Sequence, residues 1–351
     1  MSKVRTVRID EKKEIMHMWD VVFGEGEAYM QLYFGRKFRP ERCMAVEEDG
    51  KLVSSLEILP YPFAFHQMQA GSGYLSGVAT LPEYRNRGLM GQMLVETFRY
   101  QRQLGQLVST LIPASASLYD LYERFGFVTA FRLQEQVIAR DESAQQLPIT
   151  LLEGPLPEQV YDCYDRHQRR YAIGSLKTPD DLDVVALEHR AGSGEIWAVW
   201  KQEQVEALAF AIWQGEELLL KEVIAQDEAQ RMALIQTLMA HYQVQQCRLT
   251  TGGCEDGKPL GMARVVHVQR ALSFYTTAHP YQHAVLKIND PLVPENCGVY
   301  VLQGGECRLA PEGTNGMEVD IPTLTEFLLL GGNLGGLWHA FVQPYMNLML
   351  N

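Results

Sequence analysis

The stretch LPEYRNRGLMGQML, residues Leu81 to Leu94, decides the fold of the first third of the chain. The residues before it, GYLSGVATL, have the composition of a β-strand, and an amphipathic helix is predicted to begin at about Gly88. A turn between a strand and a helix exposes backbone N–H groups, and Arg85 and Arg87 add positive charge to this one. Gly88 lets the backbone approach a ligand closely, and both guanidinium groups can donate charge-assisted hydrogen bonds to phosphate oxygens. The turn is therefore predicted to bind an anion at a helix N-terminus.

The spacing of this turn differs from that of the two common nucleotide-binding loops. Neither the P-loop pattern GxxxxGK[ST] nor the dinucleotide pattern GxGxxG occurs at this place. ATP and NAD are therefore not indicated as the anion.

The composition is that of a globular protein with an acidic balance. With 351 residues, 46% of them hydrophobic and 21% charged, the chain is long enough for two or three domains. The 43 acidic residues outnumber the 31 basic ones and give a net charge of −12, which repels phosphate backbones. Nucleic acid is therefore not expected as a partner, whereas a cationic substrate is.

The sequence carries no signal for a membrane, for secretion or for a metal. No run of about 18 apolar residues occurs, and MSKVRTVRIDEKKE lacks the apolar segment of a signal peptide, so a cytoplasmic protein is expected. The six cysteines are scattered without a CxxC pair, which favours free thiols. His279 and His283 in HPYQH have no third ligand nearby and are assigned to a loop or strand edge.

Residues 1–140 alternate predicted strands and helices, which indicates a mixed α/β domain. A helix is expected over EIMHMWDVVF, and a hairpin of two strands over residues 42–65 turns at Asp49-Gly50. The helix after the arginine turn carries an apolar stripe suited to packing on a sheet. A short strand LVSTLI, a helix SLYDLYERFG and a strand FVTAFRL complete the domain.

Two polar breaks, DESAQQLP and TGGCEDGKPLG, divide the rest of the chain. Between them, residues 147–258 show the same alternation of predicted strands and helices as the first domain but contain no Arg-x-Arg-Gly turn. Residues 260–351 are predicted to form a smaller α+β unit.

The turn Arg85-Asn86-Arg87-Gly88-Leu89-Met90 resembles the signature Arg/Gln-x-x-Gly-x-Gly/Ala of the GNAT acetyltransferase superfamily. In that superfamily the signature binds the pyrophosphate of acetyl-CoA. Met90 departs from the usual small residue. The Eis-like N-acetyltransferases tolerate this departure, and the blocks GVATLPEYRNRGL and LYERFGF also look like theirs.

The resemblance covers the whole chain and implies an α/β (α+β) fold of two tandem GNAT-like mixed-sheet domains and a smaller third domain. Residues 1–140 would be catalytic, and residues 147–258 a degenerate GNAT-like domain without the cofactor motif. Residues 260–351 are similar to sterol carrier protein 2, on the blocks GMARVVHVQRALSF and VLKINDPLVPENCGVYVL. Because the resembled enzymes are ring-like oligomers, a homo-oligomer such as a hexamer is implied.

The resemblance also names the residues expected to bind acetyl-CoA, the co-substrate, with no metal. In GNAT folds the pantetheine arm pairs with the backbone of the strand before the turn, and the Val78 N–H would donate to the thioester oxygen. Only main chain acts there, so ordinary strand side chains fit equally well. Ser117 matches a cofactor contact but could be a helix N-cap instead. The full set is Val78, Ala79, Thr80, Arg85, Asn86, Arg87, Gly88, Leu89, Met90 and Ser117.

Acyl transfer from a thioester to an amine needs an acid for the leaving thiolate. Tyr122 in LYERFGF matches the tyrosine that acts as the general acid in the resembled enzymes. Tyr119, three residues earlier on the same helix, is the alternative, and a core-facing role suits either tyrosine.

The amine must also lose a proton to a base. In the Eis-like enzymes the C-terminal carboxylate enters the active site in this role, which carries over to Asn351. The apolar tail PYMNLMLN favours burial, which would raise the pKa of that carboxylate, but a tail packed only for stability or oligomer contact has the same pattern.

Glu25 in FGEGEAY is the best match to the family's acidic substrate-binding residue, although a solvated acidic loop would look the same. The expected acceptor is a small-molecule or peptide amine: an aminoglycoside, a polyamine or a lysine side chain. The alternative reading is a non-catalytic protein that binds acyl-CoA or lipid through the sterol-carrier-like domain, and a third is an interaction protein assembled through that domain.

Overall fold

The computed structural model describes residues 2–311 and 313–349, and the chain divides into two compact units. The first unit contains the residues up to 130 together with 260–344. The second contains residues 131–259 together with the tail residues 345–349. The third predicted domain therefore shares a compact unit with the first.

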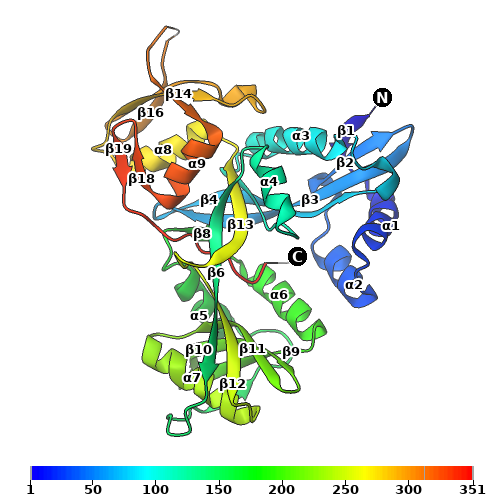
Figure 1. Ribbon diagram of the computed structural model, residues 1–351, viewed down its shortest axis with the longest axis vertical. Helices are drawn as coiled ribbons and strands as arrows, with labels where there is room; N and C mark the ends of the chain where they lie inside the picture. Colours follow the sequence, from blue (N-terminus) through cyan, green and yellow to red (C-terminus); the bar gives the residue numbers. More distant parts are fainter. Residues whose placement is uncertain (1, 312, 350–351) are drawn as a thin grey trace. The chain divides into compact units, whose positions relative to one another are not determined.

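The first unit is built on a mixed sheet with the strand order β1-β2-β3-β4-β5-β13 (Figure 1). Neighbouring strands are antiparallel except β4 and β5, which are parallel and are joined by the crossover helix α3. The elements of the N-terminal part are β1 (Lys3–Thr6), α1 (Lys12–Phe23), α2 (Glu27–Arg36), β2 (Cys43–Glu48), β3 (Lys51–Phe65), β4 (Met68–Thr80), α3 (Leu89–Gln103), β5 (Val108–Leu111), α4 (Ser117–Glu123) and β6 (Val128–Ala139), which runs into the second unit.

Several local predictions for this part are confirmed. The hairpin predicted over residues 42–65 is formed by β2 and β3 around the Asp49-Gly50 turn, and α3 begins one residue after Gly88. Helix α2 was not predicted, although Met30, Tyr33 and Phe34 give it a buried face at helical spacing. The sequence suggested an acidic loop there because the helix follows a Gly-Glu-Gly turn.

Strand β4 contains a bulge. Two of its residues, Gly77 and Val78, stand opposite a single residue of β3 in the pairing register. Gly77 has a φ of +58°, and a Cβ at this position would lie 1.8 Å from the ring of Trp19, so a glycine is required. A bulge redirects the strand and interrupts its ladder, which leaves the backbone of Val78 outside the regular β3–β4 pairing.

Residues 260–344 add a second layer of structure to the first unit. Their four-stranded sheet has the order β16-β15-β14-β17. The strands β18 and β19, which follow in the sequence, form a separate two-stranded sheet. The elements are β13 (Lys258–Val265), α8 (Val268–Ala278), β14 (Ala284–Asn289), β15 (Gly298–Gln303), β16 (Glu306–Leu309), β17 (Met317–Asp320), α9 (Ile321–Leu330), β18 (Gly332–Leu334) and β19 (Leu337–His339).

This C-terminal part shares its core with the N-terminal part of the same unit. Strand β13 pairs with β5, and Met262, Val266 and Val293 belong to one hydrophobic cluster with Phe98 and Phe127. The cluster is continuous, so the two segments are packed as one body.

A buried ion pair stands in the middle of that body. The Arg264 side chain is 1% exposed and the Asp290 side chain is 0% exposed, and their charged groups are 2.8 Å apart. Arg264 also donates to the carbonyl of Phe125 and lies over the ring of Phe98, while Asp290 accepts from Asn296. Burial lowers the pKa of Arg264 and the Asp290 charge opposes that shift, so the pair depends on both partners.

The second unit repeats the strand pattern of the first. Its sheet has the order β6-β12-β11-β10-β9-β7, in which β11 and β12 are parallel and are joined by the crossover helix α7. The elements are β7 (Ile149–Leu151), α5 (Glu158–Gln168), β8 (Ile173–Ser175), α6 (Pro179–Ala191), β9 (Gly194–Lys201), β10 (Gln204–Gln214), β11 (Glu217–Ile224), α7 (Glu228–His241) and β12 (Gln246–Gly252). Its core is separate and lies on both faces of β10 and β11.

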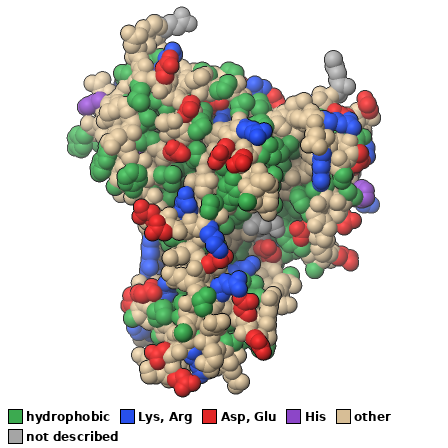
Figure 2. Space-filling model, in the orientation of Figure 1, with side chains coloured by type: hydrophobic (Ala, Val, Ile, Leu, Met, Phe, Trp, Pro, Cys, Tyr) green, Lys and Arg blue, Asp and Glu red, His purple; other side chains and the backbone are tan. Residues whose placement is uncertain are grey.

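On the face of the molecule drawn in Figure 2, acidic and basic side chains are interspersed rather than gathered by sign. No patch of a single sign of charge therefore stands out on this face. Among the described residues, no helix is long and apolar enough to cross a membrane.

Candidate active site

The parallel strands β4 and β5 stop pairing shortly before the β4 bulge. They pair only over residues 72–74 of β4 and 108–110 of β5, whereas β4 continues to Thr80. Diverging strands leave backbone groups on their inner edges that an extended ligand can pair with. The bulge at Val78 therefore faces an opening between the two strands.

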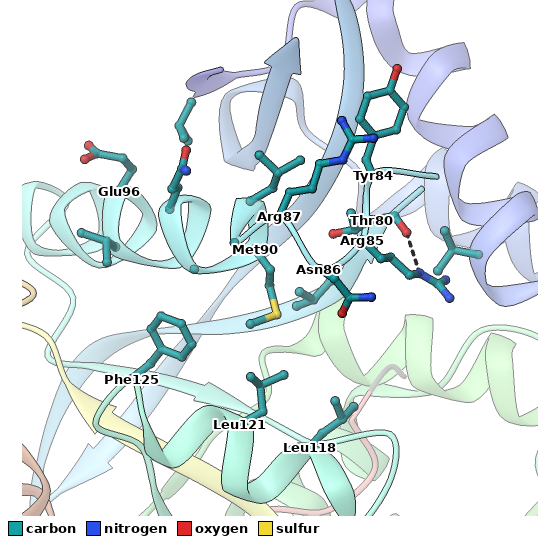
Figure 3. A pocket seen from close by; sticks show the side chains of 18 residues that line it. Thr80, Tyr84, Arg85, Asn86, Arg87, Met90, Glu96, Leu118, Leu121 and Phe125 are labelled. Carbon is teal, nitrogen blue, oxygen red and sulfur yellow. Dashed lines mark hydrogen bonds between the residues drawn. The ribbon is translucent and has the colours of Figure 1, made fainter. Parts of the chain in front are cut away.

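An open cleft of about 960 Å³ lies at this opening (Figure 3). The lining residues include most of the predicted cofactor-binding set, namely Val78, Thr80, Arg85, Asn86, Arg87, Gly88, Leu89 and Met90. Ala79, Ser117, Tyr122 and Glu25 are not among the residues that line it. The structure thus brings together the strand end and the arginine turn, two features that the sequence had linked.

The floor of the cleft at the turn is the N-terminus of α3. Gly88 is its N-cap residue, with a φ of +75°, and no side chain caps the helix. The first N–H groups of a helix have no acceptor within it, so those of the first turn remain available to a ligand. A Cβ on Gly88 would meet no atom within 4 Å, which means that the glycine serves the backbone conformation and leaves open space beside it.

Both arginines of the turn are exposed and are held by the turn itself. Arg85 Nε donates to the carbonyl of Thr80 at 3.1 Å (Figure 3). Arg87 Nη2 donates to the carbonyl of Glu83 at 2.7 Å. The Arg87 guanidinium also stacks 4.9 Å from the ring centre of Tyr84. Arg87 Nη1 also lies 3.7 Å from Oε2 of Glu48 on β2, so an anion would share this guanidinium with a carboxylate. A guanidinium has five N–H donors, and these contacts leave others on each side chain for an anion.

The wall opposite the turn is apolar. Leu118 and Leu121 of α4 and the nearby Phe125 lie across the cleft from Met90 (Figure 3). Gly91 keeps this wall close, because a Cβ there would lie 2.9 Å from the Phe125 ring. Met90 occupies the position where the resembled signature has a small residue, and here it forms part of the apolar lining.

Tyr122 and Tyr119 differ in what their hydroxyl groups do. The Tyr119 hydroxyl donates to the carbonyl of Leu260 at 3.0 Å. Tyr122 is only 5% exposed and its ring packs edge-on against Phe127, yet among the described residues its hydroxyl has no hydrogen-bond partner. Burial raises the pKa of Tyr122 to about 12, so the phenol keeps its proton at neutral pH.

The remaining predicted residues lie outside the cleft lining. Ser117 is the first residue of α4 and not its N-cap, which is Ala116; its hydroxyl pairs with that of Ser115 at 3.0 Å. The N-cap alternative for Ser117 is therefore wrong. Glu25 is half-buried in the short segment between α1 and α2. Asn351 lies outside the described residues.

Sequence reasoning missed a buried acid on β3. Glu57 is 1% exposed, and its Oε1 accepts from the Arg39 N–H at 2.9 Å. The buried Tyr33 hydroxyl lies near enough to influence the carboxyl group of Glu57. Burial raises the pKa of Glu57 to about 7, against the opposing effects of Arg39 and Tyr33. The available signal was a single acid within the apolar run SSLEIL.

Glu57→Gln is expected to remove a loss of stability that wild type shows between about pH 4.5 and pH 7. The unfolded carboxyl loses its proton first, near its usual pKa of 4.5, while the folded one holds it to about pH 7, so wild-type stability falls across this range. Glutamine stays neutral, and the variant should be about 2 kcal/mol more stable at pH 8, allowing for a weaker bond to Arg39. Urea unfolding at pH 5 and pH 8 checks this, with exposed Glu216→Gln as the control. Equal pH dependence in wild type and Glu57→Gln would contradict the assignment.

Three histidines from distant parts of the sequence also meet in the first unit. His66 and His339 are buried, His279 is half-buried, and His66 Nδ1 lies 3.4 Å from His279 Nε2. Burial and the two neighbouring rings lower the pKa of His66 to about 3, so His66 is neutral near pH 7. Among the described residues, no three His, Cys, Asp or Glu side chains are grouped so that they could hold a metal ion.

Two family models match the chain. Residues 3–130 match the acetyltransferase (GNAT) domain, and residues 268–337 match the sterol carrier protein domain. No curated protein sequence matches. GNAT acetyltransferases use acetyl-CoA as co-substrate, and the free α3 N-terminus beside two arginines fits the diphosphate of that molecule.

Solved structures with the same fold cover nearly the whole chain. A conserved protein from Enterococcus faecalis V583, described as a probable N-acyltransferase, superposes with a TM-score of 0.79 at 20% identity over 94% of this chain and 90% of its own. A GCN5-related N-acetyltransferase from Anabaena variabilis ATCC 29413 has a TM-score of 0.75 at 14% identity over 93% and 89%. Eis1 from Mycobacterium abscessus has a TM-score of 0.71 at 15% identity over 94% and 90%.

At these identities the structural similarity establishes the fold, and the family models establish the two domains within it. The cleft, the uncapped helix and the arginine turn all lie in the segment that matches the first model. Residues 3–130 thus form a GNAT acetyltransferase domain, and residues 268–337 form a sterol carrier protein domain.

Proposed function

We propose that the chain transfers the acetyl group of acetyl-CoA to a primary amine of a cationic acceptor. One observation carries the proposal: a single cleft combines the uncapped N-terminus of α3, the guanidinium groups of Arg85 and Arg87, and the β4 bulge at Val78. The first two features suit a diphosphate, and we assign the Val78 N–H, at the bulge, to the charge that develops on the thioester oxygen. The apolar wall beyond Met90 suits the uncharged arm between these two ends of the donor.

The reaction requires two proton transfers, one from the amine and one to the leaving thiolate. The amine nitrogen forms a bond to the carbonyl carbon, the C–S bond breaks, and the departing thiolate takes a proton. We assign that proton to the Tyr122 hydroxyl, because it is protonated at neutral pH and has no partner among the described residues, unlike that of Tyr119. For the proton that leaves the amine, the α-carboxylate of Asn351 stays the proposed base.

The acceptor is proposed to be cationic because the chain is acidic and Glu96 lines the cleft. The net charge is −12, and Glu25 follows Val22, a cleft-lining residue of α1, by three positions. An aminoglycoside, a polyamine and the side chain of a lysine all present the required primary amine. Glu25 is proposed to bind a second positive charge of such an acceptor.

Release of free CoA in the presence of a panel of amines tests the proposal directly. The panel contains one aminoglycoside, one polyamine and one lysine-containing peptide, each offered at several concentrations with acetyl-CoA. At least one amine is expected to raise CoA release well above the hydrolysis rate measured without amine. If acetyl-CoA binds but no amine raises release above that rate, the chain is not an N-acetyltransferase for these classes.

Replacing both arginines of the turn should chiefly weaken donor binding. Because both side chains are exposed, each is expected to contribute about 1 kcal/mol, so Arg85→Ala with Arg87→Ala should raise the acetyl-CoA Kd about 30-fold. Calorimetric titration checks this, and the difference should shrink as salt is raised. Arg308→Ala, which removes another exposed arginine, is the control. An unchanged Kd in the double variant would exclude the turn as the diphosphate site.

A further inference from the structure

The second unit contains an opening that corresponds to the acyl-donor opening of the first. Strands β11 and β12 pair in parallel only over residues 218–220 and 247–249, and then diverge as β4 and β5 do. The β10–β11 ladder also has a register shift, which leaves Lys221 unpaired next to Glu222, much as the β4 bulge lies beside its own opening. The two units thus share the same crossover, the same divergence and a bulge in the corresponding strand.

The start of α7 cannot offer an anion what the start of α3 offers. Its N-cap is Asp227, whose carboxylate accepts from the Gln230 N–H at 2.8 Å, and Glu228 adds a second acid in the first turn. One N–H of the first turn is therefore already bonded, and two acids make the local charge negative. At the start of α3, by contrast, Gly88 provides no side-chain cap. A diphosphate would be repelled from this place.

The opening of the second unit is filled by the chain's own tail. The Tyr345 N–H donates to the carbonyl of Ile173 at 2.9 Å, and the Ser175 N–H donates to the carbonyl of Tyr345 at 3.1 Å, so the tail adds a short parallel bridge beside β8. On the other side, Asn347 Nδ2 donates to the carbonyl of Lys221 on β11 at 3.0 Å. The tail is thereby held at the diverging end of the strands, as an added strand would be.

Side chains of the second unit bind this tail through hydrogen bonds and a ring stack. The Tyr345 hydroxyl donates to the buried carboxylate of Glu222 at 2.7 Å, and the ring of Tyr345 stacks on Tyr171 with centres 4.4 Å apart. Lys177, only 1% exposed, donates through Nζ to the carbonyl of Asn347 at 2.6 Å. A buried carboxylate and a buried ammonium, each bonded to the tail, are costly to keep without it.

Two glycines make room for the tail backbone. A Cβ on Gly174 would lie 2.5 Å from the carbonyl oxygen of Tyr345, and one on Gly252 would lie 3.1 Å from that of Met346. Both glycines lie in strands, where glycine costs stability unless a close approach needs it. The tail is also well covered, since Tyr345, Met346 and Met349 are all buried.

We propose that the second unit is a strand-binding module whose acyl-donor opening has been converted into a site for an extended peptide, here the chain's own residues 345–349. The tail is its ligand, recognised by Glu222 and Lys177 along with the backbone pairing of Tyr345. The unit therefore binds no acyl-CoA, and the chain takes up one donor molecule, in the first unit. The choice of acetyl-CoA as the probe rests on the proposed function, whereas the capture of the tail does not.

Hydrogen exchange on the full chain, followed by mass spectrometry, tests the capture. In wild type the amides of residues 173–175 and 345–347 should exchange slowly and together. Tyr345→Phe, which removes one hydrogen bond to a carboxylate and keeps the ring, should speed exchange in both segments about tenfold or more. Glu222→Ala should do so more strongly, and Tyr281→Phe, at a tyrosine that is 91% exposed, should change neither. A tail that exchanges like free peptide in wild type, or that ignores Tyr345→Phe, overturns the proposal.

Acetyl-CoA titration of the same proteins completes the test. One molecule per chain is expected in wild type and in both tail variants, and the Arg85→Ala with Arg87→Ala variant should weaken that single event. A second molecule bound in wild type would show that the opening of the second unit is not closed to the donor, and would overturn the proposal. If no amine supports CoA release, the proposed function fails while the exchange result still stands, so the two failures are distinguishable.

Discussion

Tyr122→Phe is expected to lower kcat by about 10²- to 10⁴-fold, the range typical for the loss of a positioned general acid, while the Kd of acetyl-CoA stays nearly constant. Burial raises the pKa of Tyr122 to about 12, which keeps the proton available at neutral pH. CoA release under saturating acetyl-CoA and amine gives kcat, and calorimetry gives the Kd.

Two comparisons make this test specific to the hydroxyl group. The phenylalanine ring keeps the edge-on contact with Phe127, so the variant should unfold at the same urea concentration as wild type. Tyr119→Phe removes a hydroxyl three residues away that already donates to Leu260, and its kcat should stay within a few-fold of wild type. Equal losses in the two variants, or full activity in Tyr122→Phe, would place the acid elsewhere.

Asp290→Ala is expected to destabilise the protein by about 3–5 kcal/mol, because it leaves the buried guanidinium of Arg264 without its counter-charge. The same carboxylate accepts from the backbone N–H groups of Leu292 and Val293, so the alanine also leaves those donors unpaired. The midpoint of urea unfolding, followed by intrinsic fluorescence, should move to a clearly lower concentration.

The exposed pair Lys287–Glu318 is the matched control, with the same 2.8 Å separation in the same C-terminal segment. Glu318→Ala should leave the midpoint of urea unfolding nearly unchanged, because water screens both charges. Replacing both buried partners, Arg264→Met with Asp290→Leu, should recover much of the stability, since no charge is then left buried. Similar losses for Asp290→Ala and Glu318→Ala would show that burial does not strengthen the pair.

The parts of the site that lie close together in the sequence could be predicted from it. The strand ending at Leu81, the turn of Arg85 and Arg87, and the helix after Gly88 are local, and each is encoded by composition and spacing over a few residues. Hence most residues expected to contact the donor do line one cleft. The helix that carries Tyr122 was predicted for the same reason, whereas the isolation of its hydroxyl depends on neighbours that no local pattern specifies.

The parts that depend on distant contacts could not be predicted. Glu57 becomes a perturbed acid only because α2, which the sequence did not indicate, places Tyr33 beside it and excludes water. His66 and His279 meet across 213 residues, and neither HPYQH nor the sequence around His66 hints at the partner. The apolar tail did favour burial, but its binding groove is assembled from strands more than 90 residues away in sequence.

Strand β13 extends the sheet beyond β5, so the family-model domain and the compact unit of the structure have different boundaries. The family model for the acetyltransferase domain ends at residue 130, yet the edge of β5 is covered by β13 and the apolar core is completed by Met262, Val266 and Val293. A piece cut at that boundary would carry every residue of the cleft and still have an open strand edge and a hollow beneath Phe98. Residues 3–130 match one complete domain model, but they form only part of one compact unit of the structure.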